Sequence, residues 1–304
     1  MDFATLQEKI RQTYGPSFDH GLIERAYAFA KESHEGQMRK SGEEFISHPL
    51  AVAALLVERK LDAPTIAAAI LHDVAEDSPY TPKDVQDRFG PEVAFLVAGV
   101  TKLKGVRYPE FAPSARTDGR TENLRKMMLA FAEDIRVILI KLMDRLHNME
   151  TISFLKPDAQ KRIAHETLEM YAPLANRLGM GELKGQLEDL AFPVAYPNEY
   201  RELKSRATET LEARLAFVAR LIPTIRELLE RAAVPILDIH ARAKHWYSLW
   251  KKLERYEGNV DRVYDLIAVR IIVDSVEHCY GALGAIHGAW PPLPGRIKDF
   301  IALP

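Results

Sequence analysis

The feature that most constrains this chain is a short segment, residues 70–77, with the sequence ILHDVAED. It holds four metal-binding or proton-accepting side chains: His72, Asp73, Glu76 and Asp77. On a continuous helix, His72 would lie one turn before Glu76, and Asp73 one turn before Asp77. Carboxylates crowded in this way raise one another's pKa, and a bound cation or substrate relieves the repulsion. The segment therefore indicates a metal site. The alternative is an exposed acidic helix in which His72 is a surface residue.

The composition is that of a soluble enzyme. Of the 304 residues, 47% are hydrophobic and 28% are charged, which is typical of a globular chain with two domains. A net charge of −2 argues against non-specific binding of nucleic acid. The single cysteine, Cys279, cannot form an internal disulfide. The first residues do not form a signal peptide and no apolar run could cross a bilayer, so we expect a cytoplasmic protein without a membrane partner.

Helical periodicity dominates the chain up to residue 233. Asp62 is a predicted N-cap for the helix that carries residues 70–77, and Gly90 with Pro91 predicts a break between two later helices. Residues 104–121 have no periodicity and predict a loop, whereas residues 122–132 are amphipathic. Further helices are predicted over residues 155–179, 182–190 and 201–231, the last interrupted at Pro223.

A second informative segment covers residues 134–151, DIRVILIKLMDRLHNMET. Its apolar part alone could form a strand, but its full length favours a buried helix. On this helix Asp144, Asn148 and Thr151 would share one face. A carboxylate within so apolar a helix needs a partner. Asp144 is therefore a candidate member of the same site as residues 70–77.

After residue 233 the pattern changes to that of an α/β module. Two β-like segments, residues 234–240 and 264–273, flank a helical segment over residues 246–256, and a further helix is predicted over residues 278–286. The predicted fold is therefore a mainly α-helical bundle, followed by helical linker segments and a partial α/β domain.

Histidines and carboxylates on three separate elements are what a metal site in a helical bundle requires. The candidate ligands are His48, His72, Asp73 and Asp144. Two imidazoles with two carboxylates fit Mn²⁺, Fe²⁺ or Zn²⁺, and ligand type does not distinguish them. A divalent ion would acidify water and neutralise phosphate charge, which predicts hydrolysis of a phosphate ester or anhydride.

Other polar residues suit the same chemistry. Glu76 and Asp77 lie just beyond the predicted ligands and could orient or deprotonate the attacking water. His147 is interpreted as a core histidine rather than a ligand. Four cations could balance an anionic substrate, although such residues are commonly only solvated: Arg39, Lys40, Lys141 and Arg145.

The order of His48, His72-Asp73 and Asp144 resembles the HD-domain metal-dependent phosphohydrolases. The surrounding motifs are more specific. They are RKSGE at residues 39–43, HDVAED at 72–77, GVTKL at 99–103 and DRLHNM at 144–149. Together they resemble the RelA/SpoT-type bifunctional (p)ppGpp synthetase/hydrolases, which control the alarmone of the bacterial stringent response. The likeness covers nearly the whole chain.

For the first half of the chain, the resemblance implies a single Mn²⁺ held by His48, His72, Asp73 and Asp144. It implies removal of the 3′-pyrophosphate of (p)ppGpp to give GDP or GTP. Glu76 and Asp77 correspond to the acidic pair that activates water, and Arg39 to an arginine that stacks on guanine. The family's other nucleotide-contacting positions fall on Lys40, Asn148 and Thr151.

For the second half, the resemblance is to the synthetase (GTP pyrophosphokinase) domain, which transfers pyrophosphate from ATP to GDP or GTP. Its ATP phosphates would contact Arg242, Lys244 and Lys252, with Ser248 nearby, and Asp265 would hold Mg²⁺. Arg296 and Lys298 also fall at cationic positions of the family.

Two departures from the family qualify the synthetase prediction. Ala241-Arg242-Ala243-Lys244 stands where the family usually has Gly-Arg-Pro-Lys, which keeps both charges. The segment Tyr-Gln-Ser-Leu-His and the later strand with a second catalytic glutamate are not in this sequence. We therefore expect a truncated, inactive synthetase. Regulatory C-terminal domains and a ribosome contact are expected only in a longer protein.

The predicted domains are a hydrolase domain at residues 1–155, a helical linker bundle at 156–196 and the truncated synthetase at 197–304. Two alternatives stay open. One is another HD phosphohydrolase acting on nucleoside monophosphates or deoxynucleoside triphosphates. The other is a non-catalytic module that senses nucleotides.

Overall fold

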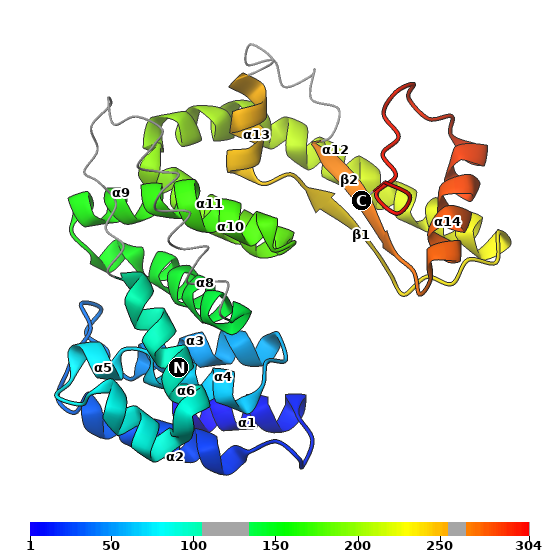
Figure 1. Ribbon diagram of the computed structural model, residues 1–304. Coiled ribbons are helices and arrows are strands. Elements are labelled where there is room, and N and C mark those ends of the chain that lie inside the picture. The colour runs from blue at the N-terminus through cyan, green and yellow to red at the C-terminus, as the bar shows by residue number, and fades with distance from the viewer. Residues whose placement is uncertain (105–133, 255–265, 304) are drawn as a thin grey trace. The chain divides into compact units, whose positions relative to one another are not determined.

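The computed structural model describes residues 1–104, 134–254 and 266–303 (Figure 1). The chain forms two compact units, Met1–Ala195 and Tyr196–Pro304. The described residues are mostly helical and contain one two-stranded sheet, which confirms the predicted fold class. The amphipathic helix predicted over 122–132 lies outside the described residues, as does the loop predicted over 104–121 apart from its first residue.

The first unit is a bundle of helices whose ends are set by local sequence. Asp62 accepts a hydrogen bond from the backbone N–H of Thr65, which confirms it as the predicted N-cap of α4. Asp134 caps α8 in the same way through Arg136 N. The elements of this unit are α1 (Phe3–Thr13), α2 (His20–Ser33), α3 (Ser47–Glu58), α4 (Ala63–Leu71), α5 (Val74–Asp77), α6 (Pro82–Lys104), α8 (Ile135–Glu150), η1 (Ile152–Phe154), α9 (Pro157–Glu166), the π-helical η2 (Thr167–Tyr171), α10 (Ala172–Arg177) and α11 (Gly181–Ala195).

Helix α4 forms the centre of this bundle. Every residue of α4 except Pro64 is buried, and the helix contacts α2, α3, α6 and α8. A helix that is apolar on all sides has no solvent-facing side and packs in the interior. Its C-terminal end therefore delivers His72 into the core of the unit.

Helix α6 bends where the sequence predicted a break. Gly90 adopts φ 84° and ψ 171°, a conformation that is easily reached only without a Cβ, and Pro91 follows it. Beyond the bend, α6 packs closely on α8: a Cβ added at Gly99 would lie 2.8 Å from Val137 Cγ2. This close approach explains the small residue within the GVTKL motif.

Replacing Gly99 with alanine is therefore expected to destabilise the first unit. Val137 is β-branched and cannot rotate freely within α8, so the helices must separate, at about 1–3 kcal/mol for an overpacked contact. Urea unfolding followed by circular dichroism measures the change. Gly284→Ala is the matched control, because no atom lies within 4 Å of a Cβ there. Equal changes in stability in Gly99→Ala and Gly284→Ala would contradict the packing argument, because the helix propensity gained from alanine is common to both.

Helix α11 and the π-helical η2 pack against α8. Helix α11 contacts α8, α9, η2 and α10, so the segment predicted as a linker, residues 156–196, packs almost wholly within the first unit. The helices predicted over 155–179 and 182–190 are confirmed as α9, η2, α10 and α11.

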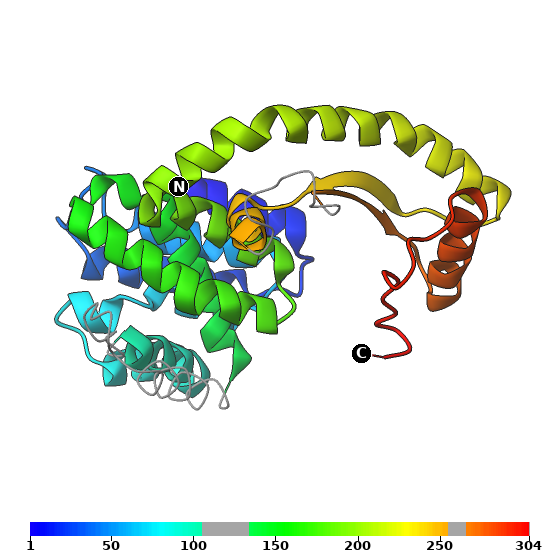
Figure 2. The same cartoon turned by 90° about the horizontal axis from the view of Figure 1, so that it is seen from above.

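The second unit is built on one long helix, α12 (Pro197–Arg231), which runs beside the strands (Figure 2). The interruption predicted at Pro223 is wrong, because the helix continues through it. Proline has a φ compatible with a helix and removes one backbone hydrogen bond. Pro223 and Ala219, whose carbonyl loses that bond, are both exposed to water, which can replace the missing donor.

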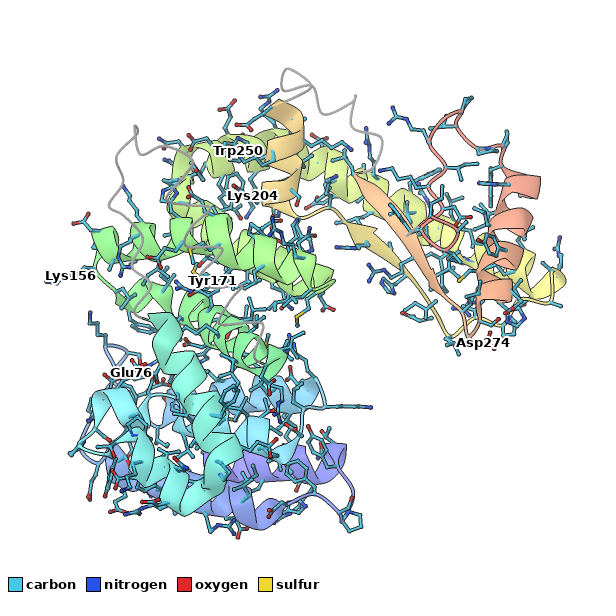
Figure 3. All side chains as sticks on the ribbon, viewed as in Figure 1. Glu76, Lys156, Tyr171, Lys204, Trp250 and Asp274 are labelled. Carbon is cyan, nitrogen blue, oxygen red and sulfur yellow. The ribbon has the colours of Figure 1, made fainter. Side chains whose placement is uncertain are left out.

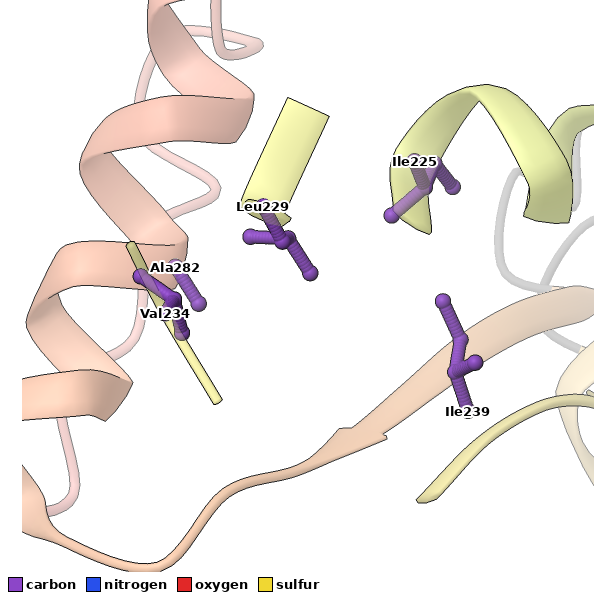
Figure 4. Close-up of a cluster of buried hydrophobic side chains, with 5 residues drawn as sticks. All are labelled: Ile225, Leu229, Val234, Ile239 and Ala282. Carbon is purple, nitrogen blue, oxygen red and sulfur yellow. The ribbon is translucent and has the colours of Figure 1, made fainter. Parts of the chain in front are cut away.

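Strands β1 (Asp238–Ala243) and β2 (Ile267–Ile272) pair antiparallel, from Asp238 opposite Ile272 to Ala243 opposite Ile267. The first strand starts later than predicted, at residue 238 rather than 234. Helices α13 (Trp246–Leu253) and α14 (Val276–Ala289) complete the unit. Its core joins α12, β1 and α14 through a cluster of apolar side chains (Figure 4), comprising Ile225, Leu229, Val234, Ile239 and Ala282.

Candidate metal centre

Three helices of the first unit bring the predicted ligands together. His48 lies in the first turn of α3, His72 caps the C-terminal end of α4, and Asp144 lies in α8. These three residues are buried and offer ligand atoms that all lie within 4.8 Å of one another. Asp73 completes the set, since its Oδ2 is 3.2 Å from His72 Nε2 and 3.9 Å from His48 Nε2. All four residues that the sequence singled out as ligands thus converge.

The backbone at residues 70–77 differs from the continuous helix that we predicted. Helix α4 ends at Leu71, His72 and Asp73 form a turn, and α5 begins at Val74. The four polar side chains therefore do not share one crowded face. His72 and Asp73 are buried, Glu76 is half-buried on α5 (Figure 3), and Asp77 is exposed.

His72 presents one ring nitrogen to the site. Its Nδ1 donates a hydrogen bond to the carbonyl of Ala69 at 2.7 Å, which fixes the ring. Its Nε2 is buried and makes no hydrogen bond with the described residues. Burial lowers the pKa of His72, but the charges of Asp73 and Asp144 outweigh it and raise that pKa to about 9. The surrounding carboxylates thus favour positive charge at this position.

Asp144 is held by neighbours on its own helix. Lys141 Nζ donates to Asp144 Oδ2 at 2.7 Å, and Asn148 Nδ2 donates to Oδ1 at 2.5 Å. Burial raises the pKa of Asp144, but Lys141 and the two histidines hold it well below the usual value. The carboxylate is therefore ionised, and its Oδ1 lies 3.2 Å from His48 Nε2.

The ring of His48 contacts a second histidine, His147, through Nδ1. His48 Nδ1 lies 2.8 Å from His147 Nδ1. Burial lowers the pKa of His48, although Asp144 opposes the shift. Burial, His48 and Arg39 together lower the pKa of His147 to about 3, so His147 is neutral. The sequence interpretation of His147 as a core histidine missed this contact.

Two of the predicted nucleotide-binding cations point into the protein. Lys141 is buried against Asp144. Arg145 pairs with Glu166 at 3.3 Å and lies 4.0 Å from the ring centroid of Tyr171. Tyr171 is on η2 (Figure 3). Their role toward a nucleotide stays a prediction, while their contacts support α8. The i,i+3 spacing of Lys141 and Asp144 was the one signal of this pairing in the sequence.

The loop before α3 carries the other cations. Arg39 NH2 donates to Thr151 Oγ1 at 3.3 Å, whereas its NH1 is buried and makes no hydrogen bond with the described residues. Lys40 is exposed. Gln37, which the sequence analysis did not single out, donates from Nε2 to the carbonyl of Asp77 at 2.8 Å and so ties this loop to α5.

The residues predicted for a synthetase site lie in the second unit. Arg242 is on β1 opposite Ala268, Lys244 follows that strand, and Ser248 and Lys252 are on α13; all four are half-buried. Arg296 and Lys298 are exposed in the segment after α14. Asp265 lies outside the described residues.

Comparison with known proteins agrees with this arrangement. A family model described as an HD domain matches residues 26–181, which contain all four candidate ligands. A second model, for a region found in RelA/SpoT proteins, matches residues 241–304. No helix among the described residues is long and apolar enough to span a membrane.

The chain is also similar to individual proteins. It is 43% identical to the bifunctional (p)ppGpp synthase/hydrolase SpoT of Escherichia coli over 99% of this chain and 42% of that protein. It is 43% identical to a GTP pyrophosphokinase of Myxococcus xanthus over 96% of this chain and 38% of that protein. A solved structure, titled as a metazoan ortholog of SpoT that hydrolyses ppGpp, is 25% identical, with a TM-score of 0.42 over 59% of this chain and 96% of its own.

The helical bundle and its histidine and aspartate cluster define an HD-domain protein. With the matching region in its second unit, the chain belongs to the RelA/SpoT family. It spans less than half the length of the two curated relatives named above, 42% and 38%.

Proposed function

We propose that the first unit hydrolyses the 3′-pyrophosphate of (p)ppGpp, releasing pyrophosphate and GDP or GTP. The observation that carries this proposal is the buried convergence of His48, His72 and Asp144, with ligand atoms within 4.8 Å, beside Asp73. The names of the relatives, which include a (p)ppGpp synthase/hydrolase, support the choice of substrate.

The four converging residues suit a divalent ion, and we propose Mn²⁺. The buried His72 Nε2 makes no hydrogen bond with the residues that the structure describes, and it lies 3.2 Å from the carboxylate of Asp73, as a metal ligand could. Two imidazoles with two carboxylates form a mixed nitrogen and oxygen set that Mn²⁺ accepts. When bound, the ion would acidify water and neutralise phosphate charge.

The residues around this centre would activate the attacking water and bind the nucleotide. Glu76 follows the ligand Asp73 by one turn, with its N–H bonded to the Asp73 carbonyl at 3.1 Å, so α5 is attached directly to the metal centre. We assign Glu76 and Asp77 to orienting and deprotonating the attacking water. Arg39, anchored by Thr151 through one nitrogen, keeps a buried NH1 and a planar face for the guanine nucleotide.

For the second unit we propose ATP and Mg²⁺ as ligands, on the strength of the family region that matches it. Arg242, Lys244, Ser248 and Lys252 lie on β1, on α13 and in the short connection between them, so one continuous segment carries these polar groups. Binding of Mg²⁺-ATP to the chain, lost in an Arg242→Ala variant, would support this assignment.

Mn²⁺ binding is expected to strengthen as pH rises. A ligating imidazole must be deprotonated, and the pKa of His72 is raised to about 9 by Asp73 and Asp144 against the effect of burial. Below that pKa the ion must displace one proton, so affinity should rise about tenfold per pH unit. Calorimetric titration of metal-free protein near neutral pH, in buffers of different ionisation enthalpy, measures both affinity and proton release. A pH-independent affinity would contradict the protonation assigned to His72.

A substrate panel tests the proposed activity against other HD phosphohydrolases. The protein with Mn²⁺ is incubated with ppGpp, pppGpp, a nucleoside monophosphate and a deoxynucleoside triphosphate. We expect pyrophosphate release from the first two substrates alone, because we assign Arg39 to a guanine nucleotide and the metal centre to a 3′-pyrophosphate. Turnover of the deoxynucleoside triphosphate with ppGpp left intact would favour the alternative enzyme class. Binding of ppGpp without turnover would favour a sensing module.

A further inference from the structure

The contact between His48 and His147 offers a role for a residue outside the predicted ligand set. Their Nδ1 atoms are 2.8 Å apart, and the ring centroids are 4.9 Å apart at an interplanar angle of 37°. His147 lies three residues after Asp144 on α8, so both side chains leave the helix on the same side. Helix α8 therefore carries both the predicted ligand Asp144 and the residue, His147, that contacts the predicted ligand His48.

The direction of this hydrogen bond follows from the proposed metal centre. His48 Nε2 lies 3.2 Å from Asp144 Oδ1 and 3.9 Å from Asp73 Oδ2, so Nε2 is the atom that faces the site. An imidazole that ligates through Nε2 keeps its hydrogen on Nδ1. His48 is buried, so this N–H requires an acceptor within the protein. The atom in position to accept it is His147 Nδ1.

His147 is itself held in place by the end of α8. Its carbonyl accepts hydrogen bonds from Thr151 N at 3.1 Å and from Thr151 Oγ1 at 3.0 Å. The same Thr151 hydroxyl accepts a bond from Arg39 NH2 at 3.3 Å. Hydrogen bonds thus connect Arg39 to the backbone of His147, and the side chain of the same residue contacts His48.

We propose that His147 is a positioning residue: it accepts the Nδ1–H of His48 and so fixes the tautomer and ring orientation that expose His48 Nε2 to the metal. This inference rests on the proposed metal centre and extends it by one residue. Acceptors behind metal-ligating histidines raise metal affinity, and their loss typically weakens it by about 10- to 100-fold.

Two substitutions of His147 separate its hydrogen bond from its volume. His147→Leu removes the acceptor, whereas His147→Asn offers an amide oxygen at the position of Nδ1. His287→Leu, which replaces a half-buried histidine of α14 in the second unit, is the matched control. Each metal-free protein is titrated with Mn²⁺ by calorimetry, and circular dichroism checks that each is folded.

We expect His147→Leu to bind Mn²⁺ about 10- to 100-fold more weakly than wild type, with His147→Asn recovering most of the affinity and the control unchanged. Wild-type affinity in a folded His147→Leu protein would overturn the inference. Equal weakening by leucine and asparagine would also overturn it, because the effect would then not follow from the acceptor at this position. Failure of wild type itself to bind Mn²⁺ would overturn the proposed metal centre and, with it, this inference.

Discussion

Asp144→Asn is expected to lose both Mn²⁺ retention and ppGpp hydrolysis. Asp144 supplies one of the converging ligand atoms, and its negative charge favours a cation at the centre. Asparagine keeps the size of the side chain and can still accept a hydrogen bond from Lys141, which lies 2.7 Å from Asp144 Oδ2. Alanine would instead leave the buried ammonium of Lys141 unpaired, which costs about 3–5 kcal/mol of stability. A loss of activity could then not be distinguished from a loss of folded protein.

The expected loss of Mn²⁺ affinity exceeds the roughly 10- to 100-fold typical when a residue that only supports a ligand is replaced. Metal content after gel filtration and calorimetric titration measure it. Asp134→Asn is the matched control, because Asp134 caps the same helix through Arg136 N and asparagine is an equally good cap. Wild-type Mn²⁺ affinity and hydrolysis rate in an Asp144→Asn protein would show that Asp144 is not a metal ligand.

Glu76→Gln is expected to lower kcat by about 10²- to 10⁴-fold, the usual contribution of a positioned general base. Glutamine keeps the shape of Glu76 but cannot accept a proton. Because the ligands His72 and Asp73 are unchanged, Mn²⁺ affinity should stay at the wild-type value. Steady-state kinetics with ppGpp and calorimetry on the same preparation separate the two properties.

Asp77→Asn distinguishes the members of the acidic pair. Asp77 is exposed and contributes its backbone carbonyl to Gln37, whereas Glu76 is half-buried. We therefore expect a smaller loss of kcat for Asp77→Asn than for Glu76→Gln. Glu35→Gln, on the exposed surface before Arg39, is the control. Full activity in Glu76→Gln would show that another group accepts the proton.

Local sequence signals predicted those parts of the structure that local chemistry controls. Asp62 caps α4 because its side chain reaches the N–H of Thr65, three residues away. Gly90 bends α6 because its φ of 84° disfavours any residue with a Cβ. The convergence of the candidate ligands was also predicted, because histidines and carboxylates on three separate elements are what a metal site in a helical bundle requires.

Features that depend on packing could not be predicted in this way. No glycine or proline marks the helix break at His72 and Asp73 in the sequence. The break lies where both side chains are buried in the core. Pro223 signalled a break that did not occur, because its exposed position tolerates the missing hydrogen bond. The contact of His48 with His147 joins residues 99 positions apart, which no periodicity reveals.

The most direct test of the central claim is titration of metal-free protein with Mn²⁺ while pyrophosphate release from ppGpp is followed. We predict no release without metal, a linear rise with added Mn²⁺, and saturation at one ion per chain. The reason is that the described part of the chain holds one set of converging ligands, His48, His72, Asp73 and Asp144. Absence of release from folded protein at saturating Mn²⁺, or full release in a metal chelator, would contradict the account.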